Sequence, residues 1–351
     1  MTMIRLKDVA KRVGVSQMTV SRVLRGAPDI SPATQARVHA AARALGYVPD
    51  LMARGLRTRR TELVGCVLPR LHDPFWGPAA AAIEAAARAR RRDLLLLCSE
   101  GDEEIEETAL ARLLGRRVEG VLLAPVQRPR AAGGIYRHLV EQRAKLVLLG
   151  PKPPFLAGFP SVRFADREAV AVGLRHLLEL GHRRVAFLAG PTLSPVARER
   201  LEGYRETLRR AGIEADDRLV IRAGTSLADG ENATRQLLAE ERDFTALAAV
   251  NDAVAAGALR ALTAAGRAVP EQVSLMGLGN HPGAEWAGVP LTTVDPAPAE
   301  LAHTAARTLF TILDGGRAGD QLLPPRLLRR ASTAPPPPET DTAAPASPQP
   351  R

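Results

Sequence analysis

The outward-facing side chains of a short predicted helix near the amino terminus are the first candidates for chemistry. Gln17, Met18, Ser21 and Arg22 share one side of a helix that begins after Ser16. Arginine can form two hydrogen bonds to the edge of guanine, glutamine can pair with adenine, and methionine can contact the methyl group of thymine. Side chains of these types predict a helix that reads base edges in the major groove of DNA.

The element that would position this helix is a helix-turn-helix. Leu6 starts a first helix with one apolar face, Gly14 permits a tight turn, and the hydroxyl of Ser16 can cap the second helix. The side chains expected to pack between the two helices are Val9, Ala10, Val13, Val20, Val23 and Leu24. An ordinary helical hairpin is the alternative interpretation of this pattern taken by itself.

The distribution of charge favours the DNA-binding interpretation. Residues 1–60 contain twelve basic and three acidic residues, and twelve less three leaves +9 of the formal net charge of +10. Such a concentration is expected where a protein contacts phosphates. The rest of the chain is close to neutral, which argues against a generally cationic protein. The residues predicted to contact DNA from this region are Gln17, Met18, Thr19, Ser21, Arg22 and Arg25.

A third helix and a linker complete the amino-terminal region. Ser31 and Pro32 are a typical helix start, and the helix continues over 33–45 until Gly46 ends it. Residues 1–48 are therefore predicted to form a small all-helical headpiece. Residues 49–61 form a linker whose helical segment is too short to be stable alone.

From residue 63 onward, apolar runs alternate with helical stretches. The predicted strands are 63–68, 94–98, 120–123, 146–149, 185–189, 219–221, 246–250 and 273–276, and the predicted helices include 78–92, 103–114, 168–180, 196–211, 231–240 and 253–265. Continuous apolar strands separated by helices predict an α/β fold with parallel, doubly wound sheets covered on both faces. Two such sheets, with the chain crossing between them, would leave a ligand cleft at their strand ends.

Other features limit the class of protein. No apolar run is long enough to span a membrane and no signal segment precedes the first helix, so we expect a cytoplasmic protein without membrane contact. Cys66 and Cys98 are the only cysteines, and each lies in an apolar run, so neither a metal site nor a disulfide is expected. No nucleophile elbow or phosphate-binding glycine loop is present, so we expect neither an enzyme nor a cofactor. Residues 334–351 are rich in Pro and Ala and are predicted to be disordered.

Seven motifs occur in a specific order between Leu6 and Thr333. They are DVAKRVGVSQMTVSRVL, LGYVPDLMARGLRTRRT, Asp73-Pro74-Phe75-Trp76, Leu180-Gly181-His182-Arg183-Arg184, Arg198-Glu199-Arg200-Leu201-Glu202-Gly203-Tyr204, Val250-Asn251-Asp252 and Pro290-Leu291-Thr292-Thr293-Val294. This set resembles the lactose/galactose repressor family of bacterial transcription regulators. The resemblance implies a nucleoid-associated repressor that binds a palindromic operator as a homodimer and is controlled by a small-molecule effector.

The resemblance also implies a division of the chain. Residues 49–61 would form a hinge helix on DNA, with Leu56 wedged into a base step of the minor groove and Ala53 nearby. Gly55 beside Leu56 would cost about 1 kcal/mol of helix propensity. Residues 62–333 would form a core like periplasmic sugar-binding proteins. Its first subdomain is expected at about 62–162 and 293–320, and its second at about 163–292 and 321–333.

The effector site implied by the resemblance lies in the cleft of this core. Its expected residues are Phe75, Trp76, Arg200, Asn251, Gly279 and Asn280. Gly279 stands where the family usually has an aspartate, and an aromatic lid position falls near Thr225. Arg200 is retained whereas this aspartate is absent, and a guanidinium without that acid favours an anionic ligand. The segment 277–280 also resembles the gluconate-repressor branch, so a sugar acid such as gluconate is the hypothesis, with a neutral sugar as the alternative.

Two other functions remain open at this point. A transport-binding protein would share the core fold, but it would need a secretion signal in place of the headpiece. A regulator whose core answers to a partner protein, or which acts as an activator, is compatible with everything in the sequence.

Overall fold

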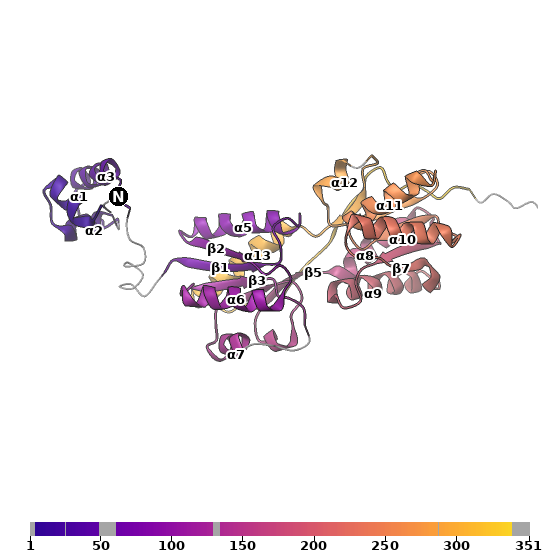
Figure 1. Cartoon of the computed structure of the whole chain (residues 1–351), viewed down its shortest axis with the longest axis horizontal. Coiled ribbons are helices and arrows are strands. Elements are labelled where there is room, and N and C mark those ends of the chain that lie inside the picture. The colour runs from indigo at the N-terminus through magenta and orange to yellow at the C-terminus, as the bar shows by residue number, and fades with distance from the viewer. Residues whose placement is uncertain (1–3, 25, 49–60, 129–133, 287, 339–351) are drawn as a thin grey trace, which may run out of the picture. The chain divides into compact units, whose positions relative to one another are not determined.

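The computed structural model describes residues 4–24, 26–48, 61–128, 134–286 and 288–338. The chain divides into two compact units, Met1–Thr61 and Glu62–Arg351, whose helices and some of whose strands are labelled in Figure 1. Of the predicted DNA contacts, Arg25, Ala53 and Leu56 lie outside the described residues.

The first unit contains the three predicted helices, α1 (Leu6–Val13), α2 (Gln17–Val23) and α3 (Pro32–Leu45). Gly14 ends α1 in the left-handed region at φ +74°, and the Ser16 hydroxyl accepts a hydrogen bond from the Thr19 amide at 3.0 Å. The Ser31 hydroxyl caps α3 through the amide of Thr34. The buried apolar side chains between the helices are Val9, Ala10, Val13, Val20, Val23, Val38 and Ala42.

The second unit contains two six-stranded sheets. The first has the order β11-β5-β4-β3-β1-β2 and is entirely parallel. Its strands are β1 (Leu63–Leu68), β2 (Asp93–Cys98), β3 (Gly120–Leu123), β4 (Leu146–Leu149), β5 (Ser161–Phe164) and β11 (Gln321–Leu323). The second has the order β12-β10-β9-β8-β6-β7, in which only the pair β10 and β12 is antiparallel. Its strands are β6 (Val185–Ala189), β7 (Val220–Arg222), β8 (Ala246–Ala249), β9 (Ser274–Leu278), β10 (Thr292–Asp295) and β12 (Arg326–Leu328).

Helices cover both faces of each sheet, as parallel strands require. The helices of this unit are α5 (Trp76–Ala89), α6 (Glu103–Gly115), α7 (Gly134–Glu141), α8 (Asp166–Glu179), α9 (Pro195–Arg210), α10 (Leu227–Ala239), α11 (Asp252–Ala264), α12 (Pro282–Trp286) and α13 (Pro298–Leu313). In the first half of this unit, which is built around the first sheet, α5 packs beside α13. The buried apolar side chains of α6 and α7 belong to a separate cluster. In the second half, α8 packs beside α9, and α10 packs beside α11. The predicted α/β fold with a helical headpiece is therefore confirmed.

Helices α10 and α11 approach so closely that only glycine fits at their crossing. A β-carbon at Gly230 would lie 2.1 Å from the carbonyl oxygen of Val254, and one at Gly257 would lie 2.0 Å from that of Leu227. Because these neighbours are backbone atoms, neither can move aside without shifting a helix.

The crossings between the halves differ from the predicted boundaries. Strand β10 was assigned to the first half, but it pairs with β9 and β12 of the second sheet. Strand β11 was assigned to the second half, but it pairs with β5 of the first sheet. The chain therefore crosses after Asp295 and after Leu323. Strands β5, β10, β11 and β12 were not predicted, because they are short and mixed in composition. Helices α7, α12 and α13 were not among the helices named in the prediction.

The carboxyl-terminal segment is anchored to the second sheet. The amide of Leu275 donates to the carbonyl oxygen of Ser332 at 2.7 Å, and the buried ring of His182 contacts the carbonyl oxygen of Ala334 at 2.9 Å. The predicted disordered tail began at Ala334, and this start is too early because the amide of Ala334 also bonds to the Ser274 hydroxyl. Residues 339–351 lie outside the described part of the chain.

Two further types of feature are absent from the described residues. No helix there has the length and apolar character needed to cross a bilayer. No three side chains of His, Cys, Asp or Glu are grouped there in a way that would hold a metal ion.

The histidine that holds the carboxyl-terminal segment predicts a pH dependence of stability. Burial lowers the pKa of His182 below its usual value of about 6.5, so the folded core favours the neutral ring. The free energy of unfolding should therefore fall as the pH falls from about 6.5 toward the lowered pKa. Urea unfolding of wild type and His182→Gln between pH 5 and pH 8 measures this effect. The dependence should be weaker in the variant, and an equal dependence in both proteins would contradict the assignment.

Candidate functional site

The second helix of the first unit presents an exposed polar side. Gln17 is exposed, the Met18 side chain is 72% exposed, and Ser21 is half-buried. This agrees with the outward direction predicted for all three. Thr19 is half-buried instead, and its hydroxyl lies 2.9 Å from that of Ser16, so it contributes to the cap of the helix.

The arginine predicted to contact guanine has a partner within its own unit. The Arg22 guanidinium forms an ion pair with Asp29, and both side chains remain about half exposed. Sequence reasoning did not identify this pair, because Asp29 lies beyond the end of α2. An exposed ion pair of this kind contributes little to stability, so Asp29 can orient the guanidinium without preventing a contact with DNA.

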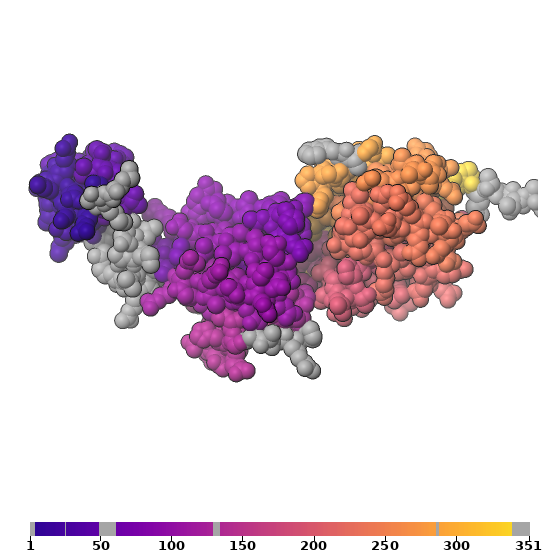
Figure 2. Space-filling view, in the orientation of Figure 1, coloured from indigo at the N-terminus to yellow at the C-terminus, as the bar shows by residue number. Residues whose placement is uncertain are grey.

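The second unit contains a cavity of about 740 Å³ between its two sheets. The space-filling view shows a hollow between the first half, in purple, and the second half, in pink to orange (Figure 2). Its walls come from the loops after β1, β3 and β4 on one side and after β6, β8 and β9 on the other. Since these are the carboxyl ends of parallel strands, the cavity lies where open α/β sheets bind ligands.

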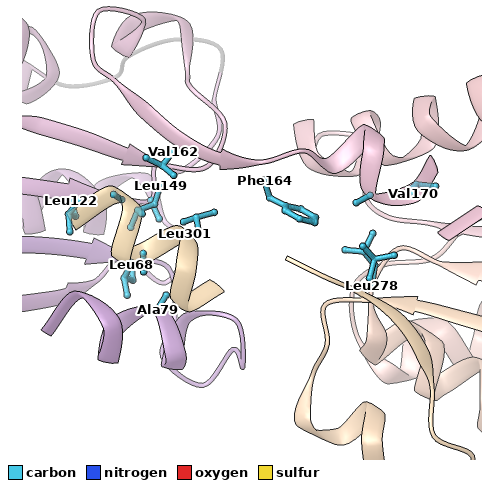
Figure 3. Close-up of a cluster of buried hydrophobic side chains, with 14 of the residues drawn as sticks. Leu68, Ala79, Leu122, Leu149, Val162, Phe164, Val170, Leu278 and Leu301 are labelled. Carbon is cyan, nitrogen blue, oxygen red and sulfur yellow. The ribbon is translucent and has the colours of Figure 1, made fainter. Parts of the chain in front are cut away.

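Five of the six predicted effector residues line this cavity. They are Phe75, Trp76, Arg200, Asn251 and Gly279, and the predicted lid position Thr225 lines it as well. The rings of Phe75 and Trp76 meet edge to face with their centroids 4.7 Å apart. Phe164, the last residue of β5, lines the cavity and lies between the apolar side chains of the two halves (Figure 3).

Asn280 is the predicted residue that does not line the cavity. Its side-chain oxygen accepts a hydrogen bond of 2.8 Å from Arg330. Its backbone is in the left-handed region at φ +48°, which leaves His281 at the cavity wall in its place. Asn280 thus differs from the other predicted effector residues in its position, because the turn after β9 directs its side chain toward the carboxyl-terminal segment.

The guanidinium of Arg200 is paired with an acid inside the cavity. Its Nε and one terminal nitrogen lie 2.7 and 2.6 Å from one oxygen of Asp166, and another nitrogen donates to the carbonyl oxygen of Val250 at 2.6 Å. Both side chains are largely buried. Asp166 was not predicted as a site residue, because the strand before it was not recognised.

Asn251 and Asp252 organise the wall formed by the second sheet. Asn251 caps α11 through the amide of Val254 and donates to the carbonyl oxygen of Thr225 at 3.0 Å. Asp252 is buried and accepts hydrogen bonds from the Thr293 hydroxyl at 2.6 Å and the His281 amide at 2.7 Å. Burial raises the pKa of Asp252, although these two bonds oppose the rise.

Gly277 is required by the carboxylate that packs against it. A β-carbon at Gly277 would lie 2.1 Å from an oxygen of Asp252, and one at Gly279 would lie 3.3 Å from the other oxygen. Gly279 also has φ +138°, which side chains rarely adopt. The glycines of this segment therefore make room for a carboxylate that comes from α11.

A buried ionic cluster supports the opposite wall. Glu106 accepts a hydrogen bond of 2.6 Å from the amide of Val126, and it also contacts the buried side chains of Arg128 and Tyr136. Burial raises the pKa of Glu106. Gln127, which lines the cavity, donates from its side chain to the carbonyl oxygen of Pro151 at 2.9 Å. These contacts hold in place the loop after β3, which forms this wall of the cavity.

The charges of the cavity lining are balanced. Its arginines are Arg70 and Arg200, and its acids are Asp73 and Asp166. Arg70 also lies 3.5 Å from the carboxylate of Glu100. Among the described residues, neither arginine of the lining lacks an acidic partner. The expectation of a sugar acid rested in part on a guanidinium without an acid, and the pairing of Arg200 with Asp166 removes that part. The resemblance of the segment 277–280 to the gluconate-repressor branch is its other part.

Comparison with known proteins agrees with both units. Residues 5–50 match the family described as bacterial regulatory proteins, lacI family. Residues 174–333 match the periplasmic binding protein-like domain. The HTH-type transcriptional regulator GalR of Escherichia coli (strain K12) is 33% identical over 334 residues, which cover 94% of this chain and 96% of GalR. The regulator CelR of Thermobifida fusca is 34% identical over 321 residues, which cover 88% and 92% of the two chains.

Solved structures agree with this similarity. The Lac repressor dimer bound to operator and the anti-inducer ONPF superimposes with a TM-score of 0.85 at 30% identity, covering 95% of this chain and 100% of that chain. The CelR–cellobiose complex gives 0.70 at 32% identity, covering 94% and 99%. With a helix-turn-helix, two parallel sheets and more than 30% identity over nearly the whole length, this chain belongs to the LacI family of DNA-binding transcriptional regulators, and it is not an enzyme.

Proposed function

We propose that this regulator is a homodimeric repressor of a palindromic operator and that a neutral sugar in the cavity releases it from DNA. The observation that carries the choice of ligand is the charge balance of the lining, in which Asp166 neutralises Arg200. The proposed DNA contacts are those predicted on α2, together with Arg25 and with Leu56 and Ala53 in the linker 49–61.

The cavity has the groups that a neutral sugar uses. The paired carboxylate and guanidinium of Asp166 and Arg200 can accept from and donate to sugar hydroxyls. The rings of Phe75, Trp76 and Phe164 offer apolar surface to the face of a pyranose. A ligand with its own negative charge would need a cation without a partner to offset its desolvation.

Relatives support the same choice. One similar structure is a regulator in complex with cellobiose, which is a neutral sugar. Another is a repressor dimer bound to its operator. Several similar curated proteins are named as CytR repressors.

The proposed control is a change in the relative orientation of the two sheets. A ligand that contacts both walls stabilises one orientation, and the linker 49–61 transmits the difference to paired DNA-binding units. A coupling of about 1–3 kcal/mol changes operator affinity by roughly 5- to 150-fold, which is sufficient for regulation.

Replacing the arginine of α2 tests the mode of DNA recognition. Arg22→Ala should cost about 1–3 kcal/mol of operator binding and relax specificity at one position of each half-site, because a guanine contact is lost. Titration onto a set of single-base operator variants at fixed salt measures both effects. Arg267→Ala, at an exposed arginine of the core, is the control. An equal loss on every sequence would instead make Arg22 a phosphate contact.

Replacing the arginine of the cavity tests the ligand. Arg200→Lys keeps the charge but loses the forked geometry, so it should weaken sugar binding at least about tenfold. Operator binding without sugar should stay unchanged. Arg205→Lys, on the same helix and paired with the exposed Asp217, is the matched control.

Calorimetry and operator release are then measured with galactose, cellobiose and gluconate. The proposal is supported if a neutral sugar gives a heat of binding and releases the protein from operator DNA. Tight binding of gluconate with no response to either neutral sugar would replace it with the sugar-acid alternative. Specific operator binding unaffected by every compound would contradict the proposed ligand class.

A further inference from the structure

The amino edge of the first sheet, where the chain enters β1 to β4, brings together four segments that precede strands, three of which follow a helix. The amide of Asp93 donates to the carbonyl oxygen of Glu62, and that of Glu119 donates to Leu63, each at 2.8 Å. The amide of Val121 donates to the carbonyl oxygen of Lys145 at 2.8 Å. These bonds place the segments 61–62, 90–92, 116–119 and 142–145 side by side.

The charge of this edge is strongly positive. Its four segments contain seven basic residues and two acidic ones, which leaves +5. The basic residues are Arg90, Arg91, Arg92, Arg116, Arg117, Arg143 and Lys145, and the acidic ones are Glu62 and Glu119. Asp93, the first residue of β2, and Asp314, which pairs with Arg90, add two acids beside them.

Three arginines of the edge are available for a partner. Arg91, Arg116 and Arg143 are exposed, and each follows the end of a helix. Within the described parts of the chain, their side chains make neither an ion pair nor a hydrogen bond. Arg92, in contrast, is largely buried and paired with Glu119 at 3.0 Å.

Helix ends alone do not account for this charge. Cations are favoured at the carboxyl ends of helices, and that effect applies equally to the second sheet, which has the same connections. The segments before β6 to β9, 180–184, 211–219, 240–245 and 265–273, contain five basic and seven acidic residues, which leaves −2. The excess is therefore particular to the first sheet.

The two edges also differ in what the chain attaches to them. The unit that carries the helix-turn-helix ends at Thr61, and β1 begins at Leu63, on the basic edge. The edge with the positive charge is thus the one joined to the DNA-binding unit. Charge complementarity and covalent connection both identify the same partner, which is the phosphate backbone of DNA.

We propose that the amino edge of the first sheet contacts DNA phosphates while the helix-turn-helix is bound, through Arg91, Arg116 and Arg143. This inference rests on the DNA binding described above. The contact adds affinity without sequence preference, because phosphates are the same at every base pair. It also adds to the salt dependence of binding, by about 0.9 in the slope of log K against log salt for each contact.

The test compares two triple variants of the full chain with the same loss of charge. The edge variant is Arg91→Gln, Arg116→Gln and Arg143→Gln. The matched control is Arg198→Gln, Arg209→Gln and Arg267→Gln, three exposed arginines of the second half that also have no partner among the described residues. Affinity is measured on operator DNA and on a non-operator duplex of equal length over a series of salt concentrations.

The edge variant should lose at least about tenfold in affinity at low salt on both duplexes, and its salt slope should fall by about 1 or more. The ratio of operator to non-operator affinity should not change. Replacing the same three residues with Lys should restore the slope, and this also excludes misfolding as the cause. Equal slopes and affinities in the edge variant and the control would overturn the inference.

The same data separate this inference from the operator proposal. If the wild-type protein did not prefer operator over non-operator DNA, the operator proposal would be contradicted. The loss of affinity in the edge variant could still be measured on the non-operator duplex. Loss of affinity on operator alone would also overturn the inference, since phosphate contacts do not distinguish sequences.

Discussion

Parallel pairing of the strands is the constraint on which the rest of the core depends. Because β1 to β5 run in one direction, and β6 to β10 do so in the second sheet, each connection falls on one of two edges. Segments that follow a strand gather at the carboxyl edges, and segments that precede one gather at the amino edges. The cavity is built only from the first kind, and the basic surface only from the second. The direction of the strands therefore places the cavity and the basic surface at opposite edges of the first sheet.

Much of this arrangement could be predicted from the sequence, because long apolar runs predict buried strands. Phe75, Arg200 and Asn251 line the cavity as the family resemblance implied, because each matches a position of the family's cleft. Asp166 was missed because β5 has only four residues and contains a charged one, so no strand was predicted before it. Asn280 does not line the cavity because its backbone lies in the left-handed region and turns the side chain away, and residue type alone does not show that turn.

The crossings were the least predictable part of the fold. Strands β10 and β11 are adjacent in the chain apart from α13, yet they belong to different sheets. Their partners are set by packing of α13, which follows β10 but lies against β3, β4 and β5. No local pattern contains that information. The same helix places Leu301 at the cavity, so the crossing is also part of the site.

The anchored carboxyl-terminal segment has a practical consequence. Ala334 is held beside His182, Thr245 and Ser274, which lie where the chain enters strands of the second sheet. The residues beyond it therefore leave the core at an edge that neither lines the cavity nor carries the arginines of the first sheet. A surface or label attached at the exposed Pro338, the last described residue, would start from this edge and not from the cavity or the basic surface. Immobilisation at this end is accordingly suited to measuring sugar and DNA binding on one and the same sample.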